Sequence, residues 1–117
     1  MISISVSQPF ASTPEPPYYA VIFTSTLNVP AEGYGEMADR MTELAKTMPG
    51  YLGIESTRGA DGLGITVSYW SDEDSIRAWK AEAEHQTAQS RGKDQWYEHY
   101  ELRVARVERA YSGPRGR

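Results

Sequence analysis

The sequence of 117 residues contains no cysteine, which removes several classes of site at once. Without thiols the chain can form no disulfide, no thiolate metal site and no cysteine nucleophile. No apolar run reaches the roughly 18 residues that a membrane-spanning helix needs, and the N-terminus shows no basic region followed by an apolar one. We therefore expect a cytoplasmic protein with no membrane partner.

Clustered positive charge is also scarce. The formal net charge is −4, and the one basic segment, residues 103–117, is interrupted by Glu108. Proteins that bind nucleic acid neutralise phosphates with clustered Lys and Arg side chains. No glycine-rich phosphate loop, nucleophile elbow or histidine-pair helix motif is present either. These absences argue against a nucleic-acid partner and against several hydrolytic mechanisms.

The β-branched and aromatic run at 18–27 and the alternation of apolar and polar residues at 63–70 predict strands, and two further extended segments complete a set of four. They are expected over residues 18–27, 51–58, 63–70 and 102–111. Along the last strand the apolar phase slips between Val104 and Ala105, which predicts a bulge or partial cover on both faces. Residues 1–17 hold four of the seven prolines and read as an irregular segment, residues 18–111 as one domain, and residues 112–117 as a flexible tail.

Apolar residues that recur every three or four positions predict two helices. The first carries a methionine-rich buried stripe from Met37 to Met48. The second is expected to begin at Asp72 and to end at Gly92. We expect Ser71 to cap it, because the S-x-x-D spacing is typical of a capping box. The acidic residues that follow Ser71 favour a helix N-terminus, so no metal site is expected there.

The order strand, helix, strand, strand, helix, strand predicts an α+β protein of the ferredoxin-like βαββαβ class. Such a fold places two helices on one face of a four-stranded antiparallel sheet. The strands carry apolar side chains on both faces, and a chain of this length has nothing left to cover the second one. A second copy, packed sheet against sheet, is the simplest cover. We therefore expect a homodimeric α+β barrel.

Several stretches between residues 18 and 111 resemble the antibiotic biosynthesis monooxygenase domain, whose members are dimeric α+β barrels. The resemblance rests on the strand YYAVIFTS at 18–25, MPGYLGIES at 48–56, GITVSYW at 64–70, IRAWK at 76–80, His85, AQ at 88–89 and WY at 96–97. One branch of that family implies monooxygenases without a cofactor, which oxidise anthrones and related aromatics to quinones in a pocket between sheet and helices.

The other branch of the family implies haem-degrading or haem-binding proteins, which use an Asn, a Trp and an iron-ligating His. Trp79 lies at the matching place for the tryptophan, nine residues after Trp70. His85 is the candidate ligand, about one helical turn before the position of an ungapped match. Asn28 is the only asparagine, and it falls at the end of the first strand instead of within it.

The leading hypothesis is a monooxygenase that uses dioxygen on a small aromatic or quinone-like molecule. His85 and Trp79 are the candidate catalytic residues, with His85 removing or holding the substrate proton. The candidate substrate-binding residues are Phe23, Tyr69, Trp96 and Tyr100. No cofactor is expected in this case.

Each of these residues also has a structural interpretation. Trp79 lies on the predicted core face of its helix. His85 lies about 120° around a straight helix from Trp79, towards solvent, and would face a pocket only if the helix bends near Ala83. The aromatic residues from Trp96 to Tyr100 could wall a pocket or seal the dimer. Two alternative functions therefore remain: a haem binder with His85 as the axial ligand, and a dimer that binds a ligand or is purely structural, without turnover.

Overall fold

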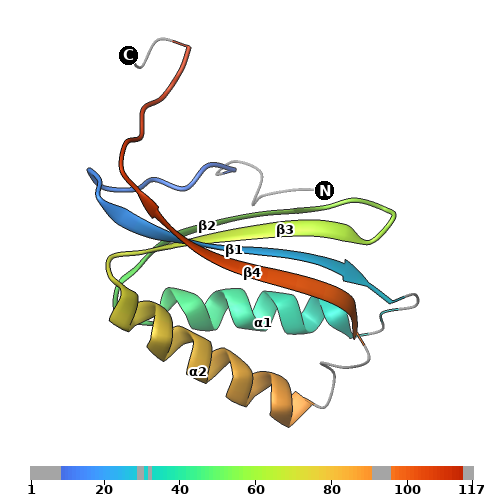
Figure 1. The fold of residues 1–117 in the computed structure, drawn as a ribbon. Coiled ribbons are helices and arrows are strands. Elements are labelled where there is room, and N and C mark those ends of the chain that lie inside the picture. The colour runs from blue at the N-terminus through green and yellow to red at the C-terminus, as the bar shows by residue number, and fades with distance from the viewer. Residues whose placement is uncertain (1–8, 29–30, 32, 91–95, 115–117) are drawn as a thin grey trace.

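The computed structural model describes residues 9–28, 31, 33–90 and 96–114. Their elements follow the predicted order (Figure 1). They are β1 (Tyr18–Leu27), α1 (Tyr34–Lys46), β2 (Tyr51–Arg58), β3 (Leu63–Trp70), α2 (Glu73–Ser90) and β4 (Tyr97–Val107). The bounds predicted for the first three strands are confirmed.

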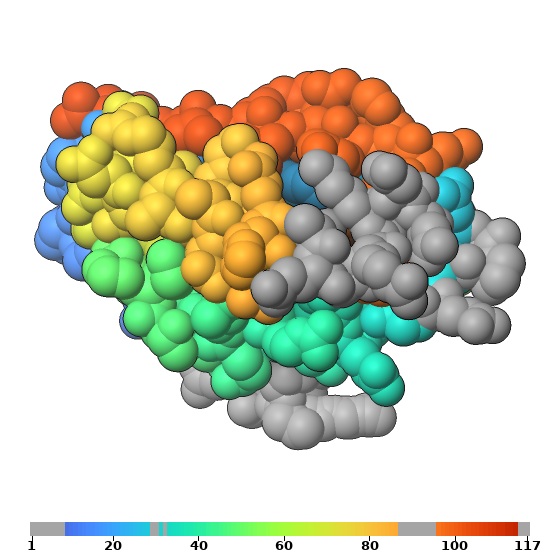
Figure 2. Space-filling model, turned by 90° about the horizontal axis from the view of Figure 1, so that it is seen from below, coloured from blue at the N-terminus to red at the C-terminus, as the bar shows by residue number. Residues whose placement is uncertain are grey.

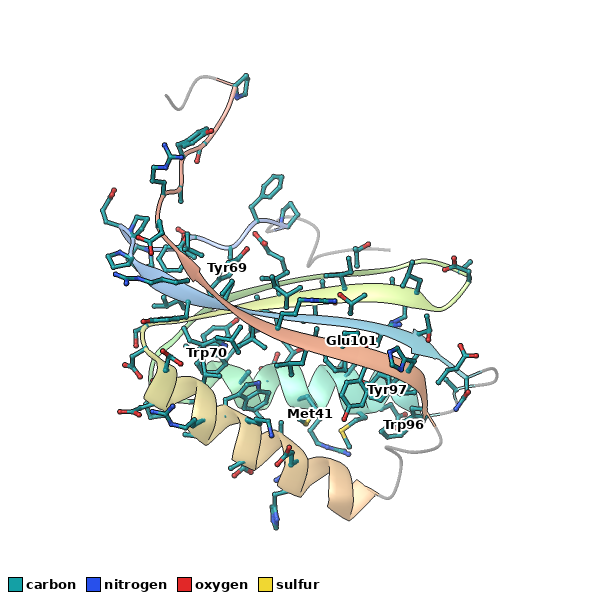
Figure 3. All side chains as sticks on the ribbon, viewed as in Figure 1. Met41, Tyr69, Trp70, Trp96, Tyr97 and Glu101 are labelled. Carbon is teal, nitrogen blue, oxygen red and sulfur yellow. The ribbon has the colours of Figure 1, made fainter. Side chains whose placement is uncertain are left out.

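The four strands form one antiparallel sheet in the order β2-β3-β1-β4. Both helices lie on one face, which we call the helix face, and the other is the open face (Figure 1). Successive residues of a strand point to opposite faces. Figure 3 shows this directly, with Tyr69 on the open face and Trp70 on the helix face. The predicted ferredoxin-like fold is confirmed.

The hydrophobic core lies between the sheet and the helices around Trp70, which has no exposed surface. The indole ring of Trp79 stacks on it from α2, with ring centroids 5.9 Å apart. The Trp70 indole N–H donates a hydrogen bond of 2.9 Å to the Ser68 hydroxyl, so its buried polar atom is satisfied. The other buried members of this core are Val21, Ala45 and Ile76.

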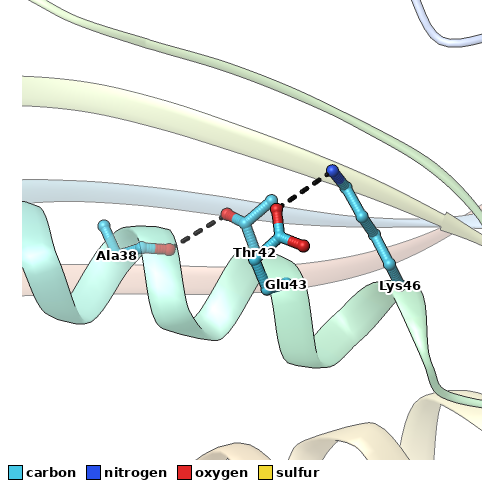
Figure 4. Close-up of polar contacts among 4 residues, drawn as sticks. All are labelled: Ala38, Thr42, Glu43 and Lys46. Carbon is cyan, nitrogen blue, oxygen red and sulfur yellow. Dashed lines mark hydrogen bonds and ion pairs between the residues drawn. The ribbon is translucent and has the colours of Figure 1, made fainter.

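The first helix buries one stripe and exposes the other, as its spacing predicts. Met37 is buried, and Figure 3 shows Met41 between α1 and α2. On the outer side, Lys46 pairs with Glu43 at 3.2 Å (Figure 4). Both side chains are more than half exposed, so the pair contributes little to stability.

The N-terminal cap of α2 differs from the prediction. Because the helix begins at Glu73, the capping position belongs to Asp72, and its carboxylate accepts the backbone N–H of Ser75 at 2.7 Å. The Ser71 hydroxyl donates to the same carboxylate at 3.0 Å. The prediction that Ser71 caps the helix is therefore wrong by one residue. Gly92, the predicted end of the helix, lies outside the described residues.

The Asp72 cap leads to a pH-dependent prediction. Hydrogen bonds donated by Ser75 and Ser71 lower the pKa of the Asp72 carboxyl, so protons bind it less readily in the folded state. Its contribution to stability is then complete above the unfolded pKa of about 3.9 and is lost as the pH falls through the lower folded value. We expect Asp72→Ala to lower the thermal unfolding midpoint at about pH 7, and Asp72→Asn, which can still cap, to lower it less. Circular dichroism melts at about pH 7 and about pH 2 measure this, and equal midpoints of parent and Asp72→Ala at neutral pH would contradict it.

The last strand is shifted relative to the expected range 102–111. It begins at Tyr97 because β1 extends to Leu27 and offers a partner for these residues. It ends at Val107, opposite Tyr18, because the prolines before Tyr18 have no backbone N–H with which to continue the ladder.

The bulge in β4 also lies elsewhere than predicted. Val104 and Ala105 pair with β1 without interruption. The register shifts at the other end of the strand, where Thr26 pairs with His99 and Leu27 pairs with Tyr97. The extra residue re-aims the Tyr97 side chain towards the helix face.

A segment from the N-terminus covers part of the open face, contrary to the expectation that no chain is left for it (Figure 1). The backbone N–H of Ala11 donates to the Glu55 carboxylate at 2.9 Å, and the Thr13 and Tyr18 hydroxyls are 2.9 Å apart. At Gly53 a Cβ atom would lie only 2.7 Å from the Ala11 methyl, so glycine permits this close approach.

Candidate functional site

The helices leave β4 uncovered on the helix face of the sheet. Figure 2, seen from the helix side, shows a recess between α2 and β4 in which atoms of β1 are visible. Besides Arg106 near its end, β4 presents three exposed apolar or aromatic side chains on the face of Val21. They are Tyr100 (40% exposed), Leu102 (44%) and Val104 (47%). An uncovered apolar strip beside a recess is the best candidate for a ligand site in the described structure.

Five aromatic rings form a continuous cluster at this end of the sheet, and we call it the aromatic cluster. It consists of Phe23, Tyr34, Trp96, Tyr97 and Tyr100. The Phe23 ring lies 5.4 Å from Tyr97 and 5.3 Å from Tyr100. The Tyr34 ring stands edge-on to Tyr97 at 5.7 Å and to Trp96 at 6.0 Å. Such contacts hold rings in fixed orientations, which suits the binding of a flat aromatic molecule.

A polar network enters this cluster from the end of β2. The Arg58 guanidinium donates to the Ser25 hydroxyl at 2.7 Å, to the Ser25 carbonyl at 3.2 Å and to the Tyr34 hydroxyl at 3.2 Å. It also donates to the Gly62 carbonyl and lies over the Tyr34 ring, 5.2 Å from the centroid. The cation is therefore held firmly, and all of these partners are neutral.

Tyr97 extends the network by one hydroxyl. Its O–H donates to the Tyr34 hydroxyl at 3.4 Å. Burial, followed by the hydrogen bond to Tyr34, raises the pKa of Tyr97 well above its usual value, although the Arg58 charge acts in the opposite direction. Tyr97 therefore stays neutral at physiological pH, and it is a hydrogen-bond donor within the cluster.

The structure brings three of the candidate substrate-binding residues together and separates the fourth. Phe23, Trp96 and Tyr100 belong to the aromatic cluster, whereas Tyr69 lies on the open face (Figure 3). The reason is the pleat of β3, because Tyr69 precedes Trp70 and must point the other way. The expectation that Tyr69 shares a pocket with Phe23 is wrong.

Tyr69 instead lines a groove of about 640 Å³ beneath the N-terminal segment. Its hydroxyl donates to the Glu55 carboxylate at 2.7 Å, and burial together with this carboxylate raises its pKa. The Tyr69 ring also packs edge-on against Tyr18, 5.9 Å away. Through these contacts with Glu55 and Tyr18, Tyr69 helps to hold the N-terminal segment against the sheet.

The two candidate catalytic residues lie apart from the aromatic cluster. Trp79 is half-buried and stacked on Trp70 in the core, which agrees with its structural interpretation. His85 is exposed on α2, which runs as one helix from Glu73 to Ser90 without a break near Ala83. The geometry therefore provides no contact through which His85 could take a proton from a ligand on the aromatic cluster.

The residues expected to hold haem do not fit that group. An axial ligand must direct its imidazole into a cavity, whereas His85 is exposed. Asn28 follows the end of β1 at Leu27, outside the strand position that the haem-degrading arrangement uses. We therefore derive no step through haem.

Sequence reasoning missed Arg58, Tyr34 and Ser25. The sequence places Arg58 at the end of a strand. Every second residue of a strand lies on the same face, so Arg58 shares the helix face with Ile54 and Ser56. A cation at an inward position is a signal that could have been used, because such a charge needs several hydrogen-bond partners. The Tyr34 contact could not have been found, because it joins residues from separate elements.

Other kinds of site receive no support from the described residues. They contain no group of three or more His, Asp or Glu side chains that could hold a metal ion. None of the described helices is both long and apolar enough to cross a membrane.

Comparison with known proteins identifies the family. The sequence model of the family described as antibiotic biosynthesis monooxygenase matches residues 19–91 of this chain. The chain belongs to the antibiotic biosynthesis monooxygenase family. The uncharacterized protein YqjZ of Bacillus subtilis (strain 168) is 56% identical over 99 residues, covering 85% of this chain and 87% of that protein.

One further relative and one solved structure carry names that describe an activity. The jasmonate monooxygenase ABM of Pyricularia oryzae is 42% identical over 46 residues, which is 39% of this chain and 21% of that protein. The crystal structure of SnoaB, a cofactor-independent oxygenase from Streptomyces nogalater, superposes with a TM-score of 0.68 at 12% identity, covering 81% of this chain and 97% of SnoaB. At that identity the likeness to SnoaB shows the shared fold.

Proposed function

We propose that this member of the antibiotic biosynthesis monooxygenase family oxidises a small aromatic, quinone-like molecule with dioxygen and without a cofactor. The recess between the sheet and α2 is the proposed site. The observation that carries the proposal is the aromatic cluster, which places stacking rings and neutral hydroxyl donors beside an uncovered apolar strip. Family membership and the cofactor-independent SnoaB support the same reading.

The proposed reaction balances without an added reductant. An anthrone and one O2 give an anthraquinone and one water, so one oxygen atom becomes the new carbonyl and the other leaves as water. The substrate supplies the electrons as its CH2 group becomes C=O. The protein then has to remove the ring from bulk water, orient it and stabilise its anion. Phe23 and Tyr100 would flank the ring, and the exposed strip of β4 would bury its edge.

We also propose a homodimer formed through the open face. Since Trp70 points towards the helices, every second residue of β3 before Tyr69 points the other way. These side chains and one neighbour on β1 are apolar: Ile22, Leu63, Ile65 and Val67. The N-terminal segment contacts the other end of this face, at Tyr18 and Glu55, so a second copy would cover the Leu63 end.

The activity is tested with 1,8-dihydroxyanthrone as the probe. We expect the parent protein to consume oxygen and form the quinone faster than the spontaneous oxidation measured with heat-denatured protein. Replacing Tyr100 by Ala removes one ring that contacts Phe23 and Tyr97. The loss of about 0.5–1.5 kcal/mol of stacking should lower kcat/KM roughly twofold to twelvefold. An oxygen electrode measures the consumption of O2, and the absorbance of the quinone measures product formation.

The matched control is Tyr111→Ala, which removes another exposed tyrosine, 74% accessible, from beyond the end of β4. It should leave kcat/KM unchanged. A parent protein with no oxygen uptake above background on this anthrone would contradict the proposal and would favour a dimer without turnover.

A further inference from the structure

Arg58 is a cation that is half-buried among neutral partners. Its hydrogen bonds go to a hydroxyl and a carbonyl of Ser25, to the carbonyl of Gly62 and to the hydroxyl of Tyr34. Among the described residues no carboxylate forms an ion pair with it. A guanidinium without a carboxylate partner favours an anion nearby.

The Tyr34 hydroxyl is the group in this network that can donate a hydrogen bond to a ligand. Its oxygen accepts one hydrogen bond from Arg58 and another from Tyr97. A phenolic oxygen has two lone pairs and one proton, so both acceptor positions are filled and the proton points elsewhere. In the described part of the chain no acceptor receives it. Donation from a charged guanidinium also polarises this O–H and strengthens it as a donor.

The position of Tyr34 places this donor at the aromatic cluster. Its ring meets Tyr97 and Trp96 edge-on, and Tyr97 in turn contacts Phe23 and Tyr100. A flat ligand stacked on Phe23 or Tyr100 would therefore lie one ring, that of Tyr97, away from the Tyr34 O–H and the positive charge of Arg58.

We propose that Tyr34 donates its proton to an oxygen anion of the bound ligand, and that Arg58 is the positioning residue that orients and polarises Tyr34. The site then selects aromatic molecules that ionise at a ring oxygen, as phenols and enols do. This assignment rests on the proposed function for the location of the ligand. Preorganised donors of this kind stabilise developing oxyanions without reorganising.

A purely structural role for Arg58 makes a different prediction. Its bonds to the carbonyls of Ser25 and Gly62 brace the β2–β3 turn against β1. Tyr34→Phe leaves those bonds in place and removes only the hydroxyl. If Arg58 is only a brace, Tyr34→Phe will not change how a ligand ionises.

The test uses 1,8-dihydroxyanthraquinone, a dye whose phenol and phenolate differ in colour and which does not undergo the proposed oxidation. We expect the bound dye to ionise at a lower pH than the free dye, and the phenolate to bind about tenfold more weakly to Tyr34→Phe while the neutral dye binds equally. Tyr97→Phe removes the neighbouring hydroxyl but keeps the Tyr34 proton, so its effect should be smaller. Arg58→Gln should match Tyr34→Phe.

Three outcomes would overturn the assignment: no binding of the dye, the same ionisation for bound and free dye, or a Tyr34→Phe variant that binds phenolate as the parent does. Because the dye assay involves no oxygen, it separates this inference from the proposed activity. A protein that shifts the ionisation of the dye but does not oxidise the anthrone would keep the anion site and lose the monooxygenase.

Discussion

Trp70→Ala is expected to lower the free energy of unfolding by about 3–5 kcal/mol. The side chain has no exposed surface, and it fills the space between β3 and both helices. Its removal leaves Trp79 without its stacking partner, and Ser68 without the indole donor. For a domain whose total stability is typically about 5–15 kcal/mol, such a loss brings the protein close to unfolding at ambient temperature.

Urea denaturation followed by circular dichroism measures this effect. We expect a much lower transition midpoint with a similar slope, because the surface exposed on unfolding changes little. Leu102→Ala is the matched control, since it also shortens a helix-face side chain of the sheet but at a position that is 44% exposed. Equal midpoints for the two variants would show that the core is not centred on Trp70.

Ile65→Asp is expected to convert the proposed dimer into a monomer. Ile65 is 42% exposed near the middle of the open face, beside Leu63 and Val67 on the same strand. A sheet-to-sheet interface would bury two symmetry-related carboxylates in apolar surroundings, at a cost of several kcal/mol. Size-exclusion chromatography with light scattering should then give half the parent mass at micromolar concentration.

The control for this substitution is Leu102→Asp. Leu102 has nearly the same exposure, 44%, but it lies on the helix face of β4. It should leave the mass in solution unchanged. A monomeric parent protein, or equal dissociation by both variants, would contradict an interface on the open face.

Much of the fold could be predicted because local patterns determine it. The patterns that predicted β1 and β3, a β-branched and aromatic run and an alternation of side chains, reflect burial that each strand encodes by itself. The end of β4 depends instead on its partner strand β1, because β1 begins at Tyr18 and offers no residue to pair with the chain beyond Val107. Likewise, Ser71 and Asp72 are both good caps, and only the start of the helix decides between them.

The candidate site could be predicted only in part. Phe23, Trp96 and Tyr100 could be proposed from the sequence because they are large aromatic residues, and the structure brings them into one cluster. The face of Tyr69 relative to Phe23 depends on how β1 and β3 pair, and neither strand reveals that register by itself. The Arg58 and Tyr34 contact joins β2 to α1, and no periodicity within either element reveals it.

Under the two proposals, the pleat of β1 assigns assembly to one surface of this thin sheet and ligand binding to the other. Ile22 faces the side where a second copy is proposed to rest, and the next residue, Phe23, belongs to the aromatic cluster on the reverse. A ligand arriving at the cluster would not have to push two protomers apart, and assembly would not obstruct its route. Substitutions on one face could therefore change substrate choice without changing the affinity between subunits, and the reverse. A substitution at Ile22 or Phe23 would affect the opposite face only by shifting the backbone that these two residues share.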